Sequence, residues 1–207
     1  MQKTLLFVDR ISTFVGHVFS FFAVALTLHV SWEVFRRYVL DSPRPWAFDV
    51  MIYFYGTLFM MAGAYTLAKN GHVRGDVLYG FFQPRTQATI DLILYIVFFL
   101  PGVFALTYAG YFYFMESYVI DEHSTITYEG PPLWPFKAVI PLAGAFVLLQ
   151  GIVEIIRCVL CLKHGTWPSR EQDVEEVDVE KLKQEVGVKD EDIAKLDEVI
   201  TKREPHK

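Results

Sequence analysis

The sequence predicts an all-α integral membrane protein with four transmembrane helices, a short interfacial helix and a charged cytoplasmic tail. Three observations lead to this prediction. Hydrophobic residues make up 53% of the 207 residues, and the mean hydropathy is +0.29. They gather into long runs free of Asp, Glu, Lys and Arg, each near the roughly 20 residues that a helix needs to cross a bilayer. Residues 163–207, in contrast, carry nine Lys or Arg and thirteen Asp or Glu, a net charge of −4.

The expected spans lie at about 11–34, 50–68, 92–115 and 138–162. The fourth reaches Leu162 only if Glu154 and Arg157 are tolerated near its end, as snorkelling allows. The first is too long for the hydrophobic core of a signal peptide, and no small-residue cleavage site follows it. We therefore expect a transmembrane domain over residues 1–162 and an acidic cytoplasmic tail over residues 163–207.

The first span contains His17 and His29, and a polar residue inside a span suggests a function. One hypothesis is haem ligation. The two histidines are twelve residues apart, or roughly 18 Å along a helix, so they cannot hold one iron together. No other span contains a histidine. The simpler hypothesis is that each histidine bonds to a neighbouring helix or lies near an interface.

A proline-rich block leads into the second span. Pro43 and Pro45 cannot sit in a helix interior, so we expect a loop or bent entry there. Trp46 is amphipathic and suits the headgroup level. Asp49 falls in the first turn, where its charge complements the helix dipole, and we expect it to cap the helix.

The second span is followed by Lys69 and by Gly71, a plausible C-cap. We expect Arg74 and Asp76 to fix the next turn by charge-assisted hydrogen bonds. Apolar residues at helical spacing within 77–82 predict a short helix in the interface plane over about residues 76–82, and a plain hydrophobic loop is the alternative.

Small residues that let membrane helices approach closely share a face in three spans. They are Gly56 and Gly63 in the second, Gly102, Ala105 and Ala109 in the third, and Gly144 and Gly151 in the fourth. Pro101, next to Gly102, predicts a kink in the third span.

The connection between the third and fourth spans contains Asp121, Glu122 and His123. These residue types can bind a metal, but no further clustered ligand is visible, which favours a solvated acidic loop. Prolines then stiffen the entry to the fourth span. Pro141 is expected one turn into that span, where a missing amide is tolerated.

Glu154 and Arg157 are three residues apart on the fourth span and can pair on one face. A proton relay would need further buried titratable groups, and none is visible, so a salt bridge at the cytoplasmic end is favoured. Cys158 and Cys161 supply only half of a four-ligand zinc site, so we expect inert helix cysteines.

Four spans place both termini on one side, together with the connection between the second and third spans. That side carries more Lys and Arg, which puts the termini in the cytoplasm, although Arg36 and Arg37 lie on the opposite side. The tail contains two short amphipathic segments that are marginal as isolated helices. Because the spans end before it, removing the chain after Ser169 should leave most activity.

The polar signatures around these spans resemble a known family. They are Arg37-Tyr38, Pro45-Trp46 with an acid at Asp49, Gly71-His72-Val73-Arg74-x-Asp76, and Trp134-Pro135-x-Lys137 followed by Ile140-Pro141. Over about residues 5–162 the chain resembles the small, DctQ-like membrane subunit of TRAP (tripartite ATP-independent periplasmic) transporters. Residues 55–65 are similar to the mannitol/chloroaromatic-compound branch. Asp49 stands where the family more often has Glu, and Gly75 where many members have an apolar residue.

The resemblance implies a non-enzymatic subunit of a sodium-driven symporter in the bacterial inner membrane. A periplasmic binding protein would deliver the substrate, usually an organic acid. A large elevator-type membrane subunit would hold the substrate and sodium ions, and this chain would scaffold it and help form the docking surface. The expected partners are these two proteins and membrane lipids, with no nucleic acid, and no cofactor is expected in this chain.

We therefore expect the signature residues to be structural or to lie at subunit interfaces, and not to form a substrate site. They are Arg37, Trp46, Asp49, Gly56, Gly63, His72, Arg74, Asp76, Trp134, Lys137, Pro141, Gly144 and Gly151. Trp46 and Asp49 should lie roughly 30 Å from residues 72–76, a full hydrocarbon thickness.

Two other functions are compatible with four spans. A membrane-anchor or cytochrome-type subunit of a redox enzyme is the main alternative, and the two span histidines are its support. A Soret band at stoichiometric haem would establish it. A free-standing channel would need a polar-lined span, which the sequence lacks.

Overall fold

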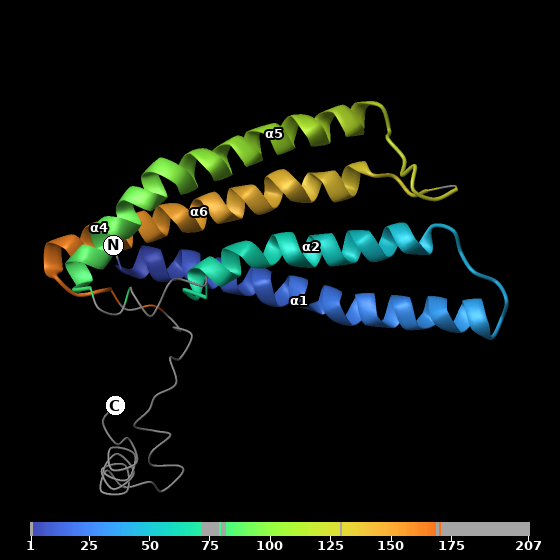
Figure 1. Cartoon of the computed structure of the whole chain (residues 1–207), viewed down its shortest axis with the longest axis horizontal. Coiled ribbons are helices and arrows are strands. Elements are labelled where there is room, and N and C mark those ends of the chain that lie inside the picture. The colour runs from blue at the N-terminus through green and yellow to red at the C-terminus, as the bar shows by residue number, and fades with distance from the viewer. Residues whose placement is uncertain (1, 72–78, 80–81, 129, 169, 171–207) are drawn as a thin grey trace, which may run out of the picture. The chain divides into compact units, whose positions relative to one another are not determined.

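The computed structural model describes residues 2–71, 79, 82–128, 130–168 and 170, which all belong to one structural unit. It consists of helices α1 (Gln2–Tyr38), α2 (Ala47–Ala68), α4 (Pro84–Leu94), η1 (Tyr95–Phe99), α5 (Leu100–Val119) and α6 (Trp134–His164) (Figure 1). The described residues contain no strand, only an isolated bridge between His123 and Pro132.

Four helical stretches are long and apolar enough to cross a membrane: Gln2–Tyr38, Ala47–Ala68, Pro84–Val119 and Trp134–His164. The predicted all-α, four-span fold is therefore confirmed. The predicted interfacial helix over residues 76–82 lies almost entirely outside the described residues, as do the amphipathic segments of the tail.

The helices extend beyond the predicted spans. α1 begins at Gln2 instead of residue 11, and the third spanning stretch begins at Pro84 instead of residue 92. The length of a charge-free run reflects only the thickness of the hydrocarbon layer of the membrane, whereas a helix continues for as long as its backbone groups find hydrogen-bond partners. Pro84 stands at the first helical position, where its missing N–H is not needed.

The helices pack as two pairs, α1 with α2 and α5 with α6 (Figure 1), and α6 joins the pairs by also contacting α1, α2 and α4. In the most apolar stretch of α6, 33% of residues are buried, compared with 6% in α1. Helix α6 is therefore the centre of the bundle, and the outer face of α1 is not covered by the other described helices.

Glycines allow the close helix approaches. A Cβ on Gly56 would come within 2.6 Å of the Phe136 ring, and one on Gly63 within 3.3 Å of Val147. Both neighbours are on α6, so the predicted glycine face of α2 is its contact with that helix. On α6, Gly144 is covered by Thr107 of α5.

The packing face of the third span differs from the predicted one. A Cβ on Gly102 would meet no atom within 4 Å, and Ala105 and Ala109 are exposed. Gly110 is buried instead, and a Cβ there would approach Ile140 to 2.7 Å. Spacing alone placed small residues on a common face but could not show which face meets α6.

The predicted kink appears as a π-helical segment, η1, directly before Pro101, and the chain bends between α4 and α5 (Figure 1). The Leu100 N–H bonds to the carbonyl of Tyr95, five residues back. Pro101 has no N–H, and its ring clashes with the carbonyl four residues earlier, at Val97. The irregularity therefore lies one turn before the proline that causes it.

Pro141 lies deeper than predicted. Because α6 begins at Trp134, Pro141 is inside the helix and not in its first turn. It cannot donate to the carbonyl of Lys137, so the helix loses one internal bond close to the site described next.

Candidate functional sites at the two ends of the bundle

Polar side chains gather at opposite ends of the bundle. We call one the loop end, formed by residues 39–46 and 120–133 with the adjoining helix ends. The other is the terminal end, where α1 begins and α2 and α6 finish. Each end holds a buried carboxylate whose charge must be compensated inside the protein.

At the loop end, Asp49 lies in the first turn of α2 and is 0% exposed. One carboxylate oxygen accepts a hydrogen bond from the hydroxyl of Ser124 and the other from that of Thr127. Asp49 therefore ties the 120–133 connection to α2. The expectation that it caps the helix was wrong. The N-cap position is occupied by Trp46, which makes no side-chain cap bond.

The same connection is held to α6 by a second ion pair. Lys137 is 5% exposed, and its ammonium group pairs with Glu122 and lies 3.8 Å from the centre of the Tyr113 ring. The hydrogen bond from Lys137 lowers the pKa of Glu122 below its ordinary value. Glu122 is thus more than part of a solvated acidic loop, because it anchors the loop.

The backbone of this connection folds back on itself. The Ser124 N–H bonds to the carbonyl of Pro131, and the Leu133 N–H to that of Glu122. His123 Nδ1 donates to the carbonyl of Gly130 at 2.8 Å. Within the described residues, no group of three His, Cys, Asp or Glu side chains could hold a metal. The bond of His123 to Gly130 instead stabilises the folded-back backbone of this connection.

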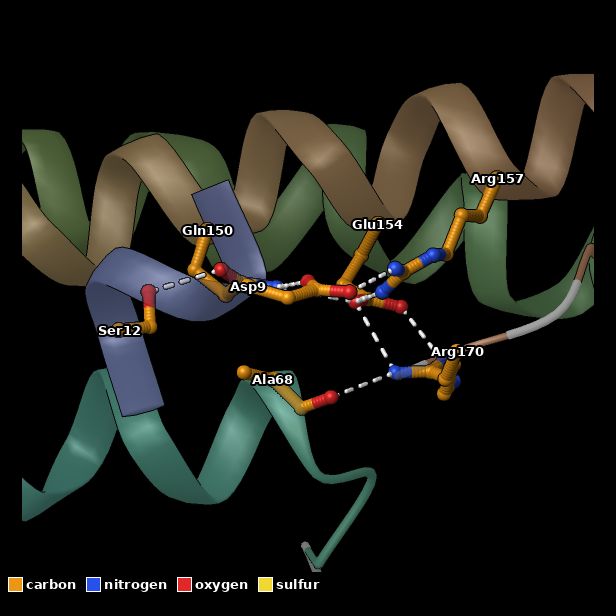
Figure 2. A network of polar contacts seen from close by, with 7 residues as sticks. All are labelled: Asp9, Ser12, Ala68, Gln150, Glu154, Arg157 and Arg170. Carbon is orange, nitrogen blue, oxygen red and sulfur yellow. Dashed lines mark hydrogen bonds and ion pairs between the residues drawn. The ribbon is translucent and has the colours of Figure 1, made fainter. Parts of the chain in front are cut away.

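At the terminal end, a polar network joins α1, α2 and α6 (Figure 2). The Ser12 hydroxyl donates to Gln150 Oε1, and Gln150 Nε2 donates to Asp9, both at 2.9 Å. Arg157 donates to Asp9 through Nη2 and to Glu154 through Nη1, the latter at 2.6 Å. The predicted pair of Glu154 and Arg157 is confirmed.

Arg170 closes this network from the chain beyond α6 (Figure 2). Its Nη1 and Nη2 donate to the two carboxylate oxygens of Glu154, at 3.1 and 2.7 Å. Nη1 also donates to the carbonyl of Ala68, at the last residue of α2, at 3.4 Å. One guanidinium therefore binds the segment after α6 to two helices.

The network contains two carboxylates and two guanidinium groups, so its formal charges cancel. Asp9, Glu154 and Arg157 are at most 2% exposed, and the Arg170 side chain is 8% exposed. A buried charge is tolerated only when it is paired and hydrogen-bonded. The expectation of no further buried titratable group beside Glu154 and Arg157 was wrong, because Asp9 is one.

Comparison with known families gives one match. Residues 26–161 match the model of "Tripartite ATP-independent periplasmic transporters, DctQ component". The match covers well over half of the chain. The chain belongs to the DctQ family. It is therefore the small-subunit component of a TRAP transporter. A search of curated proteins found no match.

The DctQ match includes the whole loop-end site but only part of the terminal-end network. Gln150, Glu154 and Arg157 lie inside it, whereas Asp9 and Arg170 lie outside. The match also does not distinguish branches of the family, so the mannitol/chloroaromatic assignment stays a prediction.

The other predicted residues of this DctQ chain lie apart from one another. Arg37 is exposed in the last turn of α1, and Trp46 stacks with the Arg44 guanidinium, 5.1 Å from the ring centre. Trp134 begins α6 and meets Tyr118 edge to face. His72, Arg74 and Asp76 lie outside the described residues.

The span histidines have ordinary structural contacts. His29 Nε2 donates to the carbonyl of Ala47 at 2.9 Å, and the His17 ring packs against Tyr65. The bond of His29 to α2 agrees with the simpler hypothesis for that histidine, and the DctQ match does not favour the redox-subunit alternative. Cys158 and Cys161 are buried and form no disulfide, and the Cys161 thiol donates to the carbonyl of Pro84 at 3.5 Å.

The sequence contained part of the signal for the terminal-end network. Asp9 and Ser12 are three residues apart, and Gln150, Glu154 and Arg157 follow at four- and three-residue intervals, so each set shares a helix face. The polar faces of these two helices could therefore have been predicted to contact each other. The contact of Arg170 could not be predicted in this way, because Arg170 lies after the end of α6 and has no helical spacing.

Proposed function

We propose that this DctQ chain is a passive scaffold in a sodium-driven importer of an organic acid. A periplasmic binding protein delivers the acid, and a large elevator-type subunit carries it across the membrane. This chain holds that large subunit and contributes to the surface on which the binding protein docks. It performs no chemistry itself.

The observation that carries this proposal is the placement of its polar groups. Among the described residues, the buried charged side chains lie in the two end clusters or at Asp91 near the start of the third spanning stretch. Asp49 and Ala68 are nineteen positions apart on α2, or roughly 28 Å at 1.5 Å per residue. Between them Thr57 is the buried polar residue, and it is neutral. An ion or acid pathway would need charged or unwound segments at mid-depth.

The test is transport in proteoliposomes that contain the complete three-protein system. Asp49→Asn and Lys137→Met remove the loop-end contacts without changing the helix count. Both variants should lower the yield of assembled complex while leaving the apparent KM of the assembled complex unchanged. A large rise in KM with normal assembly would show that this chain touches substrate or ions, and the scaffold proposal would fail.

We also propose that both termini are cytoplasmic. Ser124 is buried against Asp49 and is unsuitable for labelling, whereas Tyr128 is 80% exposed in the same connection. A cysteine replacing Tyr128 should react with an impermeant maleimide in intact spheroplasts, and one replacing Lys163 should react only after permeabilisation. The reverse pattern would overturn the orientation.

A further inference from the structure

A pocket of about 530 Å³ opens at the loop end, between the last turns of α1, the turn that follows it and the first turn of α2. Part of its wall is apolar, with Val34, Phe48 and Met51 among the lining side chains. Another part is charged. Neither part belongs to the Asp49 or Lys137 contacts described above, apart from Thr127, which borders both.

The charged wall carries a net positive charge. Arg37 and Arg44 line it together with Glu33, whose carboxylate accepts the backbone N–H of Arg44 at 2.9 Å. Two cations and one anion leave one formal positive charge. An anionic group in this pocket would therefore meet a complementary field.

Arg37 differs from the arginine beside it. The Arg36 guanidinium donates to the hydroxyl and carbonyl of Ser42, both at 3.1 Å, and is thereby occupied. Arg37 has no hydrogen bond or ion pair to the part of the chain that the structure describes, and it is exposed. A guanidinium presents five donors in a planar fork that suits phosphate oxygens.

The depth of Arg37 follows from the register of α1 and α2. The bond from His29 to the Ala47 carbonyl places His29 level with the start of α2. Arg37 is eight residues farther along, roughly 12 Å at 1.5 Å per residue. Its side chain tilts toward the helix N-terminus, hence back toward the membrane. If α2 begins at the hydrocarbon edge, the guanidinium reaches the headgroup layer, which adds about 5–7 Å to each side of the core.

The surroundings of Arg37 have the composition of a membrane interface. Trp32 and Tyr38 in the last turns of α1 and Val39 directly after it expose 56%, 79% and 64% of their surface. Aromatic rings beside cations are typical of the headgroup level. In bulk water this apolar surface would stay exposed to solvent, whereas lipid at the membrane interface would cover it.

We propose that this pocket binds one anionic phospholipid, with its phosphate on Arg37 and an acyl chain against Phe48 and Met51. The apolar wall distinguishes a lipid from a free phosphate, which would use only the cations. The exposed aromatic surface indicates that the pocket lies at the headgroup level of the membrane, where phospholipids are the most concentrated anions.

The test is native mass spectrometry of the purified full chain with dihexanoyl phosphatidylglycerol, dihexanoyl phosphatidylcholine and inorganic phosphate as separate probes. Phosphatidylglycerol should bind saturably and more tightly than the other two. Arg37→Gln should weaken that binding about tenfold or more, because hydrogen bonds between charged groups are the strong ones. Lys163→Gln removes one positive charge at the other end of the bundle, where Lys163 is exposed, and should bind like the unmodified chain.

Three results would overturn the proposal. Equal affinities for Arg37→Gln and Lys163→Gln would show that Arg37 does not hold the headgroup. Inorganic phosphate binding as tightly, with the same dependence on Arg37, would show a simple anion site. Unchanged lipid binding by Arg37→Gln, together with weaker assembly with the large subunit or the binding protein, would assign the pocket to a protein partner.

Discussion

Replacing Arg170 with alanine should destabilise the terminal end by about 2–3 kcal/mol. Removing one partner of a buried ion pair costs about 3–5 kcal/mol, because the other charge is left buried and uncompensated. Glu154 is 2% exposed, so water does not replace the two donors that Arg170 supplies. We expect a loss at or below the lower end of that range, because Arg157 still donates to Glu154 at 2.6 Å.

The measurement is thermal unfolding of the purified chain in detergent, followed by tryptophan fluorescence. A loss of this size should lower the apparent midpoint by roughly 5–10 °C, since a protein of this length shifts by about 2–4 °C for each kcal/mol. Lys163→Ala is the matched control. Lys163 is exposed in the last turn of α6, so its loss removes the same charge from the same end without breaking the network.

Truncation gives an independent form of the same experiment. The spans alone suggested that a chain ending after Ser169 would behave normally, but that chain lacks Arg170. It should show the same loss as Arg170→Ala when compared with a chain ending after Glu171, which keeps both bonds from Arg170 to Glu154. If Arg170→Ala and Lys163→Ala unfold at the same temperature, the two bonds to Glu154 contribute nothing, and the charge-balance reasoning is wrong.

Three further predictions concern packing and the loop end. Gly144→Val should prevent the close contact of α5 with α6 and lower the yield of folded protein several-fold in size-exclusion chromatography, whereas Gly102→Val, at an open position, should not. Asp49→Asn should destabilise the chain by about 1–3 kcal/mol in the same unfolding assay, because a charged acceptor of one buried and one partly buried hydrogen bond is lost. The pKa of Glu122 is lower in the folded protein than its ordinary value of 4.5. Its pairing with Lys137 is therefore fully stabilising above pH 4.5, and this stabilisation is lost as the pH falls through the pKa of the folded state. Lys137→Met should flatten the pH dependence of the unfolding midpoint in that acidic range.

The sequence was sufficient for the features that depend on composition along one helix. Charge-free runs located all four spans, and the three-residue spacing of Glu154 and Arg157 located their pair. The bend could be predicted from Pro101, because the backbone hydrogen bond that a proline cannot donate belongs to its own helix. Each of these effects is local, so no knowledge of the neighbouring helices was needed.

Features that depend on contact between distant segments were not predicted. Asp49 was expected to serve its own helix, but its partners are Ser124 and Thr127, more than seventy residues later. Gly110, and not Gly102, meets α6, because rotation about the helix axis is set by tertiary packing. The termini of α1 and α6 extend past the apolar runs for the same reason, since the polar network supports them.

The terminal-end network also sets an order of events during biosynthesis. Asp9 and its partner Arg157 are 148 residues apart in the chain. At roughly 5–20 residues per second, Arg157 is made about 7–30 s after Asp9. Throughout that interval the carboxylate of Asp9 has to stay hydrated, which keeps the start of α1 at the membrane surface until α6 arrives. Helix α1 is made before α6 but is therefore among the last elements to be locked in place, and a chain that stalls before α6 leaves Asp9 without its partner Arg157.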